Sequence, residues 1–442
     1  MSVALVILAA GKGTRMQSDL PKVLHPIAGA PLVVHALKAG ATLAPDISVV
    51  VVGHGAEAVA KAVQTYDPAL QTVLQKDQKG TGHAVAHAAP LLQDFTGDVI
   101  VLYGDTPFVS AHTLQTLQNA RAQHDIVVLG FDAADPGRYG RLVMNGDDLH
   151  EIVEYKDATT AQRAITLCNS GVICAPAPTL FDLIDRLDDQ NASGELYLTD
   201  IVGLAHTAGL TTGVVMCPQS ETLGINTPQE LATAEAQFQC QRRQQAMAQG
   251  VYLQAPDTVF FAHDTQLARG VKIDPYVVFG PGAVVDNGAH IHAFSHIEGA
   301  HVGPYARLRP GSNLAADTKV GNFVELKNAR LAQGAKVNHL SYVGDADIGQ
   351  NTNIGAGTIT CNYDGVLKHQ TQVGQDAFIG SNTMLVAPVT IGDGAMTGSG
   401  SVITDDVPAD ALALGRAKQV TKLSFVPRLR AMLLAQKQKR KG

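Results

Sequence analysis

A glycine-rich turn near the N-terminus combines chemical groups that could bind the phosphates of a nucleotide. Residues 8–16 read L-A-A-G-K-G-T-R-M, and Lys22 follows a few positions later. The backbone N–H groups of such a turn can face phosphate oxygens, and Arg15 and Lys22 can neutralise their charge. A dinucleotide fingerprint would need glycine in place of Met16, and the P-loop pattern is missing. The turn therefore predicts a phosphate site of another kind.

A carboxylate at the end of a predicted strand adds a candidate metal ligand. Asp105 follows the apolar run 99–103 and the intervening Gly104. Nucleotidyl transfer depends mainly on positioning phosphates and neutralising their charge, and Mg²⁺ in such sites takes only one or two protein oxygens. Taken alone, Asp105, Arg15 and Lys22 could each be exposed charges in turns. Together they are the parts that a nucleotidyl-transfer site requires.

A histidine in the second half of the chain is a candidate general base. His339 lies in the run V-N-H-L-S-Y at residues 337–342, and Asn362 and Tyr363 lie in an irregular segment that covers 360–372. A general base that works near pH 7 must be neutral there, and imidazole is the usual side chain. Because the chain has 16 histidines, a structural role for His339 is the alternative.

The first half of the chain alternates short apolar runs with helical stretches. The clearest predicted strands are 3–9, 47–52, 71–74, 99–103 and 126–131, with predicted helices at 31–44, 81–92 and 111–123. This alternation is typical of a mostly parallel sheet covered on both faces, in which ligands bind beyond the carboxyl ends of the strands. The 8–16 turn and Asp105 both follow predicted strands, so we expect them at the same edge. A long helix is predicted from Thr227 to Ala248, after the start signal N-T-P.

The second half of the chain has a different pattern, with one aliphatic residue in every six. The series runs through Val302, Leu308 and Leu314, slips twice by one residue, and resumes beyond the 360–372 segment as far as Ile391. Glycine often follows the aliphatic residue. Such a repeat predicts a solenoid with short flat faces, from which the 360–372 segment extends as a loop. The period alone does not determine the hand of the coil.

Composition limits the class of protein. The 442 residues, 45% of them apolar, predict two or three domains, and a net charge of −7 argues against general nucleic-acid binding. No apolar run reaches the roughly 20 residues that span a bilayer, and 3–10 lacks the features of a signal peptide. Five cysteines without a C-x-x-C pair fit a reducing compartment. We therefore expect a cytoplasmic protein without membrane insertion. The nine Lys/Arg and no Asp/Glu of 411–442 form either a solvated tail or a clamp for an anionic ligand.

These motifs resemble those of one family. The run L-A-A-G-x-G-T-R-M followed by D-L-P-K is similar to the signature of sugar-1-phosphate nucleotidyltransferases. With the long helix and the six-residue repeats, almost the whole chain resembles the bacterial bifunctional N-acetylglucosamine-1-phosphate uridyltransferases/glucosamine-1-phosphate acetyltransferases. The resemblance implies an α/β Rossmann-like nucleotidyltransferase domain and a left-handed parallel β-helix of hexapeptide repeats. The implied domains are 1–225 for uridylyl transfer, a linker helix at 226–249, 250–415 for acetyl transfer, and a basic tail at 416–442.

The resemblance implies synthesis of UDP-N-acetylglucosamine, a sugar donor for the cell wall and outer membrane, by a homotrimer. Acetyl-CoA and UTP would be co-substrates, and the sugar substrates would be glucosamine 1-phosphate and N-acetylglucosamine 1-phosphate. Arg15 and Lys22 would hold the triphosphate during catalysis, and Asp105 and Asn226 would bind Mg²⁺. The other implied nucleotide and sugar contacts are Leu8, Ala9, Ala10, Gly11, Gln75, Gly80, Thr81, Tyr103, Gly104, Gly140, Glu154 and Asn169.

The resemblance also implies a complete acetyltransferase site, with His339 as the base. The implied sugar-phosphate contacts are Arg309, Lys327, Tyr342 and Asn353. The implied acetyl-CoA contacts are Ala356, Asn362, Tyr363, Ser381, Ser399 and Arg416. Ser399 departs from the small apolar residue expected at its position. Arg416 opens the basic tail, which favours the clamp interpretation, whereas Cys361 is given no catalytic role.

Two other functions are compatible with a two-domain plan. In one, a single-activity nucleotidyltransferase uses its solenoid only for assembly, which predicts no cluster like His339 with Lys327 and Asn362. In the other, the chain is a catalytically silent interaction subunit, which should have lost Lys22, Asp105 or Asn226. Because all of these residues are present, the bifunctional enzyme is the favoured hypothesis.

Overall fold

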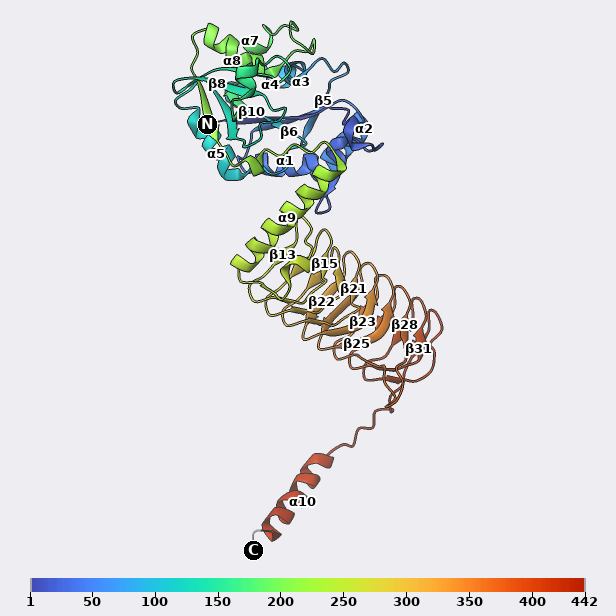
Figure 1. Ribbon diagram of the computed structural model, residues 1–442. Helices are drawn as coiled ribbons and strands as arrows, with labels where there is room; N and C mark the ends of the chain where they lie inside the picture. The colour runs from blue at the N-terminus through green and yellow to red at the C-terminus, as the bar shows by residue number, and fades with distance from the viewer. Residues whose placement is uncertain (1, 441–442) are drawn as a thin grey trace. The chain divides into compact units, whose positions relative to one another are not determined.

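The computed structural model describes residues 2–440 and divides into two compact units (Figure 1). The first comprises Met1–Gln244 with Phe261–His263, and the second comprises Gln245–Phe260 with Asp264–Gly442. Met1 of the predicted first domain, and Lys441 and Gly442 of the predicted tail, lie outside the described residues.

The first unit is built around a mixed sheet whose strand order is β11-β7-β10-β6-β1-β4-β5. Its parallel strands are β1 (Val3–Ala9), β4 (Ile47–Val52), β5 (Gln71–Leu74), β6 (Asp98–Tyr103), β7 (Ile126–Asp132) and β11 (Thr212–Met216). The five predicted strands are all present. The sequence did not reveal β10 (Leu167–Pro176), which runs antiparallel between β6 and β7.

Helices cover both faces of this sheet, as Figure 1 shows. The helices α1 (Leu32–Ala41), α2 (Ala56–Tyr66) and α5 (Ala111–Ala120) pack on one face, and α3 (Thr81–Ala86), α4 (Ala89–Leu92), α7 (Ala177–Ile184) and α8 (Ile201–Thr207) pack on the other. The predicted helix 81–92 is divided into α3 and α4. Pro90 lies at the start of α4, where its missing N–H cannot continue the hydrogen bonds of α3.

A smaller layer extends from the end of the sheet that carries β7 and β10. The antiparallel pair β8 (Arg141–Asn145) and β9 (Asp148–Val153) joins β10 through the pairing of Cys168 with Arg141, and α6 (Thr160–Arg163) follows. Gly140 precedes β8 and Glu154 follows β9, so this pair places both residues at its base.

Helix α9 (Pro228–Ala248) begins one residue after the start predicted for the long helix and ends where predicted. Its first turn has a capping box, because Glu230 N donates to Thr227 Oγ1 at 3.2 Å and Glu230 Oε2 accepts from Thr227 N at 3.0 Å. Farther along, Glu235 and Gln239 accept hydrogen bonds from the backbone of Ala28 and Phe261. These contacts fix the helix to the rest of the first unit.

The second unit is a parallel β-helix with three faces. The first face contains β12 (Tyr252–Leu253), β14 (Lys272–Ile273), β17 (His290–Ile291), β20 (Arg307–Leu308), β23 (Glu325–Leu331), β25 (Tyr342–Ile348), β27 (Ile359–Cys361), β30 (Met384–Val386) and β33 (Val402–Ile403). The second contains β15 (Val278–Phe279), β18 (His296–Ile297), β21 (Asn313–Leu314), β28 (Thr371–Val373) and β31 (Val389–Ile391). Strands β23 and β25 bend around the corner and belong to both faces.

The third face contains β13 (Gln266–Leu267), β16 (Val284–Val285), β19 (His301–Val302), β22 (Lys319–Asn322), β24 (Lys336–His339), β26 (Asn353–Ile354), β29 (Phe378–Ile379), β32 (Met396–Thr397) and β34 (Leu412–Ala413). Figure 1 shows the strands of this unit stacked as successive coils.

The six-residue pattern corresponds to the interior of these coils. Lys272 pairs with His290 and His290 with Arg307, so a coil takes 17 or 18 residues, and the shorter coils account for the slips in the pattern. The predicted inward aliphatic residues are all buried. A Cβ on Gly321 would lie 1.8 Å from the carbonyl oxygen of Asn338 in the next coil, so only glycine fits there. The loop predicted at 360–372 is shorter in the structure, where residues 362–370 lie between β27 and β28.

The basic C-terminal segment includes one helix, α10 (Phe425–Lys439), which has no buried residues. No helix within residues 2–440 is long and apolar enough to cross a membrane.

Candidate functional site

The predicted phosphate and metal residues of the first unit converge on one point. The Lys22 ammonium forms an ion pair with Asp105 and donates a hydrogen bond to Asn226 Oδ1 at 3.1 Å. Arg15 Nη2 donates to the same Asn226 oxygen at 2.8 Å. Residues that are 83 to 211 positions apart in the chain are therefore in contact.

The order of the strands explains this convergence. Strands β1 and β6 are parallel neighbours, with Leu8 paired with Tyr103, so the 8–16 turn and Asp105 leave the sheet side by side. Gly13 has a positive φ of 61°, and a Cβ there would lie 2.4 Å from Lys22 Cβ. Glycine at this position therefore lets the turn fold closely onto Lys22.

Asp105 and Asn226 fit a magnesium ion. They supply one carboxylate and one amide oxygen, which are hard donors, and leave other coordination positions for phosphates and water. One oxygen of each residue contacts the Lys22 ammonium. The position that this ammonium occupies, between the two oxygens, therefore favours positive charge.

Three cavities, together called the cleft, share Tyr103 in their lining. A cavity of about 220 Å³ lies over the turn and is lined by Leu8, Ala10, Gly11, Lys22, Gln75, Gly80, Thr81 and Asp105, among others. One of about 380 Å³ contains Arg15 and Asn226. Gln75 is 3% exposed, and its amide donates to Gly80 O at 3.1 Å, which fixes one edge of the first cavity.

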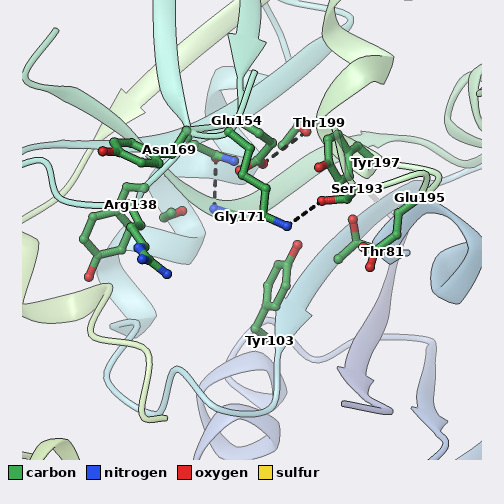
Figure 2. A pocket seen from close by; sticks show the side chains of 15 residues that line it. Thr81, Tyr103, Arg138, Glu154, Asn169, Gly171, Ser193, Glu195, Tyr197 and Thr199 are labelled. Atoms are coloured by element: carbon green, nitrogen blue, oxygen red, sulfur yellow. Dashed lines mark hydrogen bonds between the residues drawn. The ribbon is translucent and has the colours of Figure 1, made fainter. Parts of the chain in front are cut away.

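The third cavity, of about 570 Å³, contains the predicted sugar contacts (Figure 2). Figure 2 shows Glu154, Asn169 and Tyr103 directed toward it from different elements. Asn169 N donates to Gly140 O at 2.8 Å, and Asn169 Oδ1 accepts from Gly171 N at 2.9 Å. Thr199 donates to Glu154 Oε1 at 3.3 Å. The polar groups are thus held in place by their own hydrogen bonds.

Burial changes the acidity of two groups in this cavity. It raises the pKa of Tyr103, with further contributions from the carboxylates of Glu154 and Asp105, so the phenol remains a hydrogen-bond donor. Burial also raises the pKa of Glu154, although the hydrogen bond from Thr199 opposes this.

Two predicted contacts lie beneath the cleft surface. Ala9 is 2% exposed and packs in the core with β4 and β6, and Gly104 is also buried. Only their backbone groups remain for a ligand, and Gly104 N already donates to Leu8 O at 2.9 Å.

In the second unit, several predicted residues form a row along one edge of the β-helix. The register pairs Asn322 with His339, Val337 with Ile354, Ile354 with Ile379 and Ile379 with Thr397. The residues two positions after Val337, Ile354, Ile379 and Thr397 therefore stack in successive coils. They are His339, Ala356, Ser381 and Ser399. This row offers an extended surface suited to an elongated ligand.

His339 lies at the start of this row and is exposed. Its Nδ1 lies 3.3 Å from Asn322 Oδ1, and its carbonyl oxygen accepts from Gly357 N at 3.1 Å. In the tautomer with the proton on Nδ1, this nitrogen donates to Asn322 and Nε2 is left as the acceptor.

Three of the four predicted sugar-phosphate residues, Arg309, Lys327 and Tyr342, lie on the adjacent first face. Arg309 Nη1 forms an ion pair with Glu325 Oε1 at 2.9 Å, and Tyr342 OH lies 3.5 Å from Asn362 Nδ2. A contact with Lys368 lowers the pKa of Lys327, and Arg309 adds to this effect. Such a concentration of cations is suited to a phosphate. Asn353 lies on the third face, where it pairs with Lys336 and Phe378.

The remaining predicted contacts are exposed. Tyr363 is 59% exposed in the 362–370 loop, and Arg416 is exposed beyond the last strand. Burial raises the pKa of the Cys361 thiol, which keeps the thiol protonated.

Comparison with known proteins agrees with both units. Residues 5–191 match the family of MobA-like NTP transferase domains, and residues 370–405 match six repeats of the bacterial transferase hexapeptide family. The bifunctional protein GlmU of Jannaschia sp. (strain CCS1) is 59% identical over 439 residues, which cover 98% of this chain and 97% of that protein. The bifunctional protein GlmU of Paracoccus denitrificans (strain Pd 1222) is 59% identical over 441 residues, covering 98% of each. The chain belongs to the GlmU family.

Membership of the GlmU family confirms the resemblance drawn from the motifs, and with it the pairing of a nucleotidyltransferase unit with a hexapeptide β-helix. Among solved structures, a UDP-glucose pyrophosphorylase complexed with UDP-glucose covers 55% of this chain and 100% of its own, with a TM-score of 0.44 and 17% identity.

In this GlmU relative, several residues line the cleft that the sequence did not single out. Gln78 Nε2 donates to Ala10 O at 2.6 Å, and Lys156 Nζ donates to Ser193 Oγ at 2.8 Å. Arg138, Tyr139, Ser170, Gly171, Glu195, Tyr197 and Thr199 also line the cavities. The polar N-S-G run at 169–171 was the clearest available signal for two of them.

Asp200, next to the sugar cavity, should make the free protein less stable as the pH rises. Burial raises its pKa to about 6, with contributions from the carboxylates of Glu154, Asp188 and Asp157. Since the folded pKa exceeds the unfolded one, stability is lost as pH rises from about 4 through 6. After allowance for solvent screening, Asp200→Asn should raise the melting temperature at pH 8 by roughly 2–4 °C, and by much less at pH 4.5.

Scanning calorimetry at the two pH values checks this expectation. The exposed Asp189 provides the matched control, because Asp189→Asn removes a carboxylate from the same segment without a buried environment. An equal gain for Asp200→Asn at both pH values would contradict the role of burial.

Proposed function

We propose that the chain makes UDP-N-acetylglucosamine by two reactions at the two sites described above. The second unit transfers the acetyl group of acetyl-CoA to the amine of glucosamine 1-phosphate. The first unit then transfers the uridylyl group of UTP to N-acetylglucosamine 1-phosphate and releases pyrophosphate. The observation that carries the uridylyl transfer is the contact of the Lys22 ammonium with both Asp105 and Asn226.

In the uridylyl transfer, an oxygen of the sugar phosphate attacks the α-phosphorus of UTP, and the bond to pyrophosphate breaks. Arg15 and Lys22 neutralise the triphosphate, and Lys22 leaves its two partners for the phosphates as they enter. Asp105 and Asn226 would hold Mg²⁺, which would supply positive charge to stabilise the leaving pyrophosphate. The buried amide of Gln75 supports a role in reading the uracil base.

The sugar of this reaction occupies the 570 Å³ cavity. Glu154, which directly follows β9, and Asn169, near the start of β10, contact the acetamido sugar there. Their side chains are already oriented by Thr199 and Gly171, so little reorganisation is needed when the sugar binds.

In the acetyl transfer, the amine nitrogen attacks the thioester carbonyl of acetyl-CoA, and the thiol of coenzyme A leaves. His339 Nε2 removes the proton of the amine, and Asn322 holds the ring in the required tautomer. Arg309, Lys327 and Tyr342 bind the sugar phosphate, while coenzyme A lies along Ala356, Ser381 and Ser399. Asn362, Tyr363 and Arg416 complete the cofactor contacts.

The chain is proposed to act as a cytoplasmic homotrimer. Exposed large apolar side chains support an association of β-helices: Tyr305 and Phe323 are both 57% exposed and stacked, and Leu340, next to His339, is 66% exposed. A closed threefold assembly would cover such surfaces and place a second subunit beside His339.

Incubation with glucosamine 1-phosphate, acetyl-CoA, UTP and Mg²⁺, followed by mass spectrometry, tests the proposal. UDP-N-acetylglucosamine should form only when every component is present. Accumulation of N-acetylglucosamine 1-phosphate alone would mean that the first unit uses a different nucleotide or is inactive. If no product forms, the silent-subunit hypothesis replaces this one.

A further inference from the structure

Three side chains with metal-ligating atoms meet on the first face of the β-helix. They lie in the coils that precede the Arg309–Glu325 ion pair. His290 lies on β17, His292 follows that strand, and Asp274 follows β14 in the preceding coil. The register pairs Ile273 with Ile291, so Asp274 stands opposite His292. Because residues two apart in a strand project from the same face, both imidazoles point outward over the carboxylate.

The geometry brings two imidazole nitrogens to one carboxylate. His290 Nε2 lies 2.9 Å from Asp274 Oδ1, and His292 Nδ1 lies 2.7 Å from Asp274 Oδ2. The two rings lie side by side, with centroids 3.8 Å apart and planes at 32°. Among residues 2–440, this is the one group of three His, Cys, Asp or Glu side chains whose ligand atoms all lie within 4.8 Å of one another.

The backbone that carries these side chains is rigid. Ile273 and Ile291 are buried in the coil interior. Asp274 N donates to Ile291 O at 2.9 Å, and His292 N donates to Leu308 O. The side chains themselves are between 18% and 34% exposed, so an ion from solvent can reach them.

We propose that Asp274, His290 and His292 form a binding site for a zinc-class divalent transition-metal ion. Two imidazole nitrogens and one carboxylate oxygen are a donor set that zinc uses in proteins with three protein ligands, and the fourth position is left to water. The hydrogen-bonded arrangement is the proton-bound form of the same site. Binding of the ion displaces the protons that the two imidazoles share with Asp274.

Arg307 is the one neighbour that must move. Its Nε donates to His292 Nε2 at 3.1 Å, which leaves the proton of the neutral ring on Nδ1, toward Asp274. When Nδ1 binds the ion, Nε2 carries the proton instead, and Arg307 must turn away. Its side chain is 53% exposed, and the Glu325 carboxylate is already only 3.8 Å away, so an alternative partner is present.

Zinc titration of the full-length chain, prepared without a histidine tag and stripped with a chelator, tests this site. Calorimetry should show one ion per chain that is lost in Asp274→Asn, His290→Gln and His292→Gln. Each affinity should fall more than about a hundredfold, since even outer hydrogen-bond partners contribute 10–100-fold. Cobalt added in place of zinc should give visible absorption bands in the parent chain and not in these variants.

The pair formed by His301 and Asp286 supplies the matched control. His301 Nε2 lies 2.9 Å from Asp286 Oδ2 on the third face, but within residues 2–440 no third ligating side chain lies close enough to form a cluster with them. His301→Gln should therefore keep the zinc site. Equal loss in this variant would mean scattered binding to surface histidines. If Asp274→Asn, His290→Gln and His292→Gln still bound zinc fully, or if the parent chain bound none, the cluster would be only a hydrogen-bonded one.

Discussion

Asp105→Ala should lower uridylyl transfer by about a thousandfold and leave acetyl transfer unchanged. The substitution removes a carboxylate that forms an ion pair with Lys22 beside the Asn226 amide. Without it, the proposed magnesium site loses its only negatively charged ligand, and Lys22 loses its ion-pair partner. Removal of one preorganised electrostatic group typically costs 10²–10³-fold in rate, and loss of the metal adds to this. The two half-reactions can be assayed separately with the same preparation.

Asp132 offers a matched control for Asp105. It also ends a parallel strand, β7, but it is exposed and lines none of the three cavities around Tyr103. Asp132→Ala should keep both activities. Asp105→Asn separates charge from shape, and it should remain nearly as inactive as the alanine variant. If Asp105→Ala kept uridylyl transfer within tenfold of the parent, or lost acetyl transfer as well, the assignment of two separate sites would be wrong.

The parts of the fold that depend on local pattern could be predicted from the sequence. The Val- and Ile-rich runs 3–9 and 47–52 were predicted as buried strands, and the six-residue period identified the interior of each coil. The convergence of the 8–16 turn with Asp105 followed from the rule that parallel strands end at one edge. These predictions needed no information about contacts between distant residues.

The antiparallel strand β10 and the β8–β9 pair could not be predicted, because their placement depends on pairing across the sheet. Cys168 on β10 pairs with both Phe131 and Arg141, and nothing in its local sequence indicates either partner. The same cause explains the overlooked cleft residues. Lys156 and Ser193 are brought together by segments 37 positions apart, and each looks like an ordinary surface residue in sequence. The hand of the β-helix came from family resemblance, since a period is the same for both hands.

His339→Ala should lower acetyl transfer by at least about a hundredfold, with uridylyl transfer unchanged. General-base catalysis contributes roughly 10²–10⁴-fold, and the substitution leaves no other imidazole in contact with Asn322 among the described residues. Separate assays of the two half-reactions, with the parent chain and the variant prepared in the same way, check this expectation.

The variant Asn322→Ala tests whether His339 acts as the base or only maintains the structure at the corner of the coil. Asn322→Ala removes the acceptor for His339 Nδ1 but leaves the imidazole in place, so the rate should fall less than in His339→Ala. The exposed His301, on the same face in an earlier coil, serves as the control, and His301→Gln should not change the acetyl-transfer rate. If His339→Ala retained the parent rate, the proton of the amine would have to leave by another route.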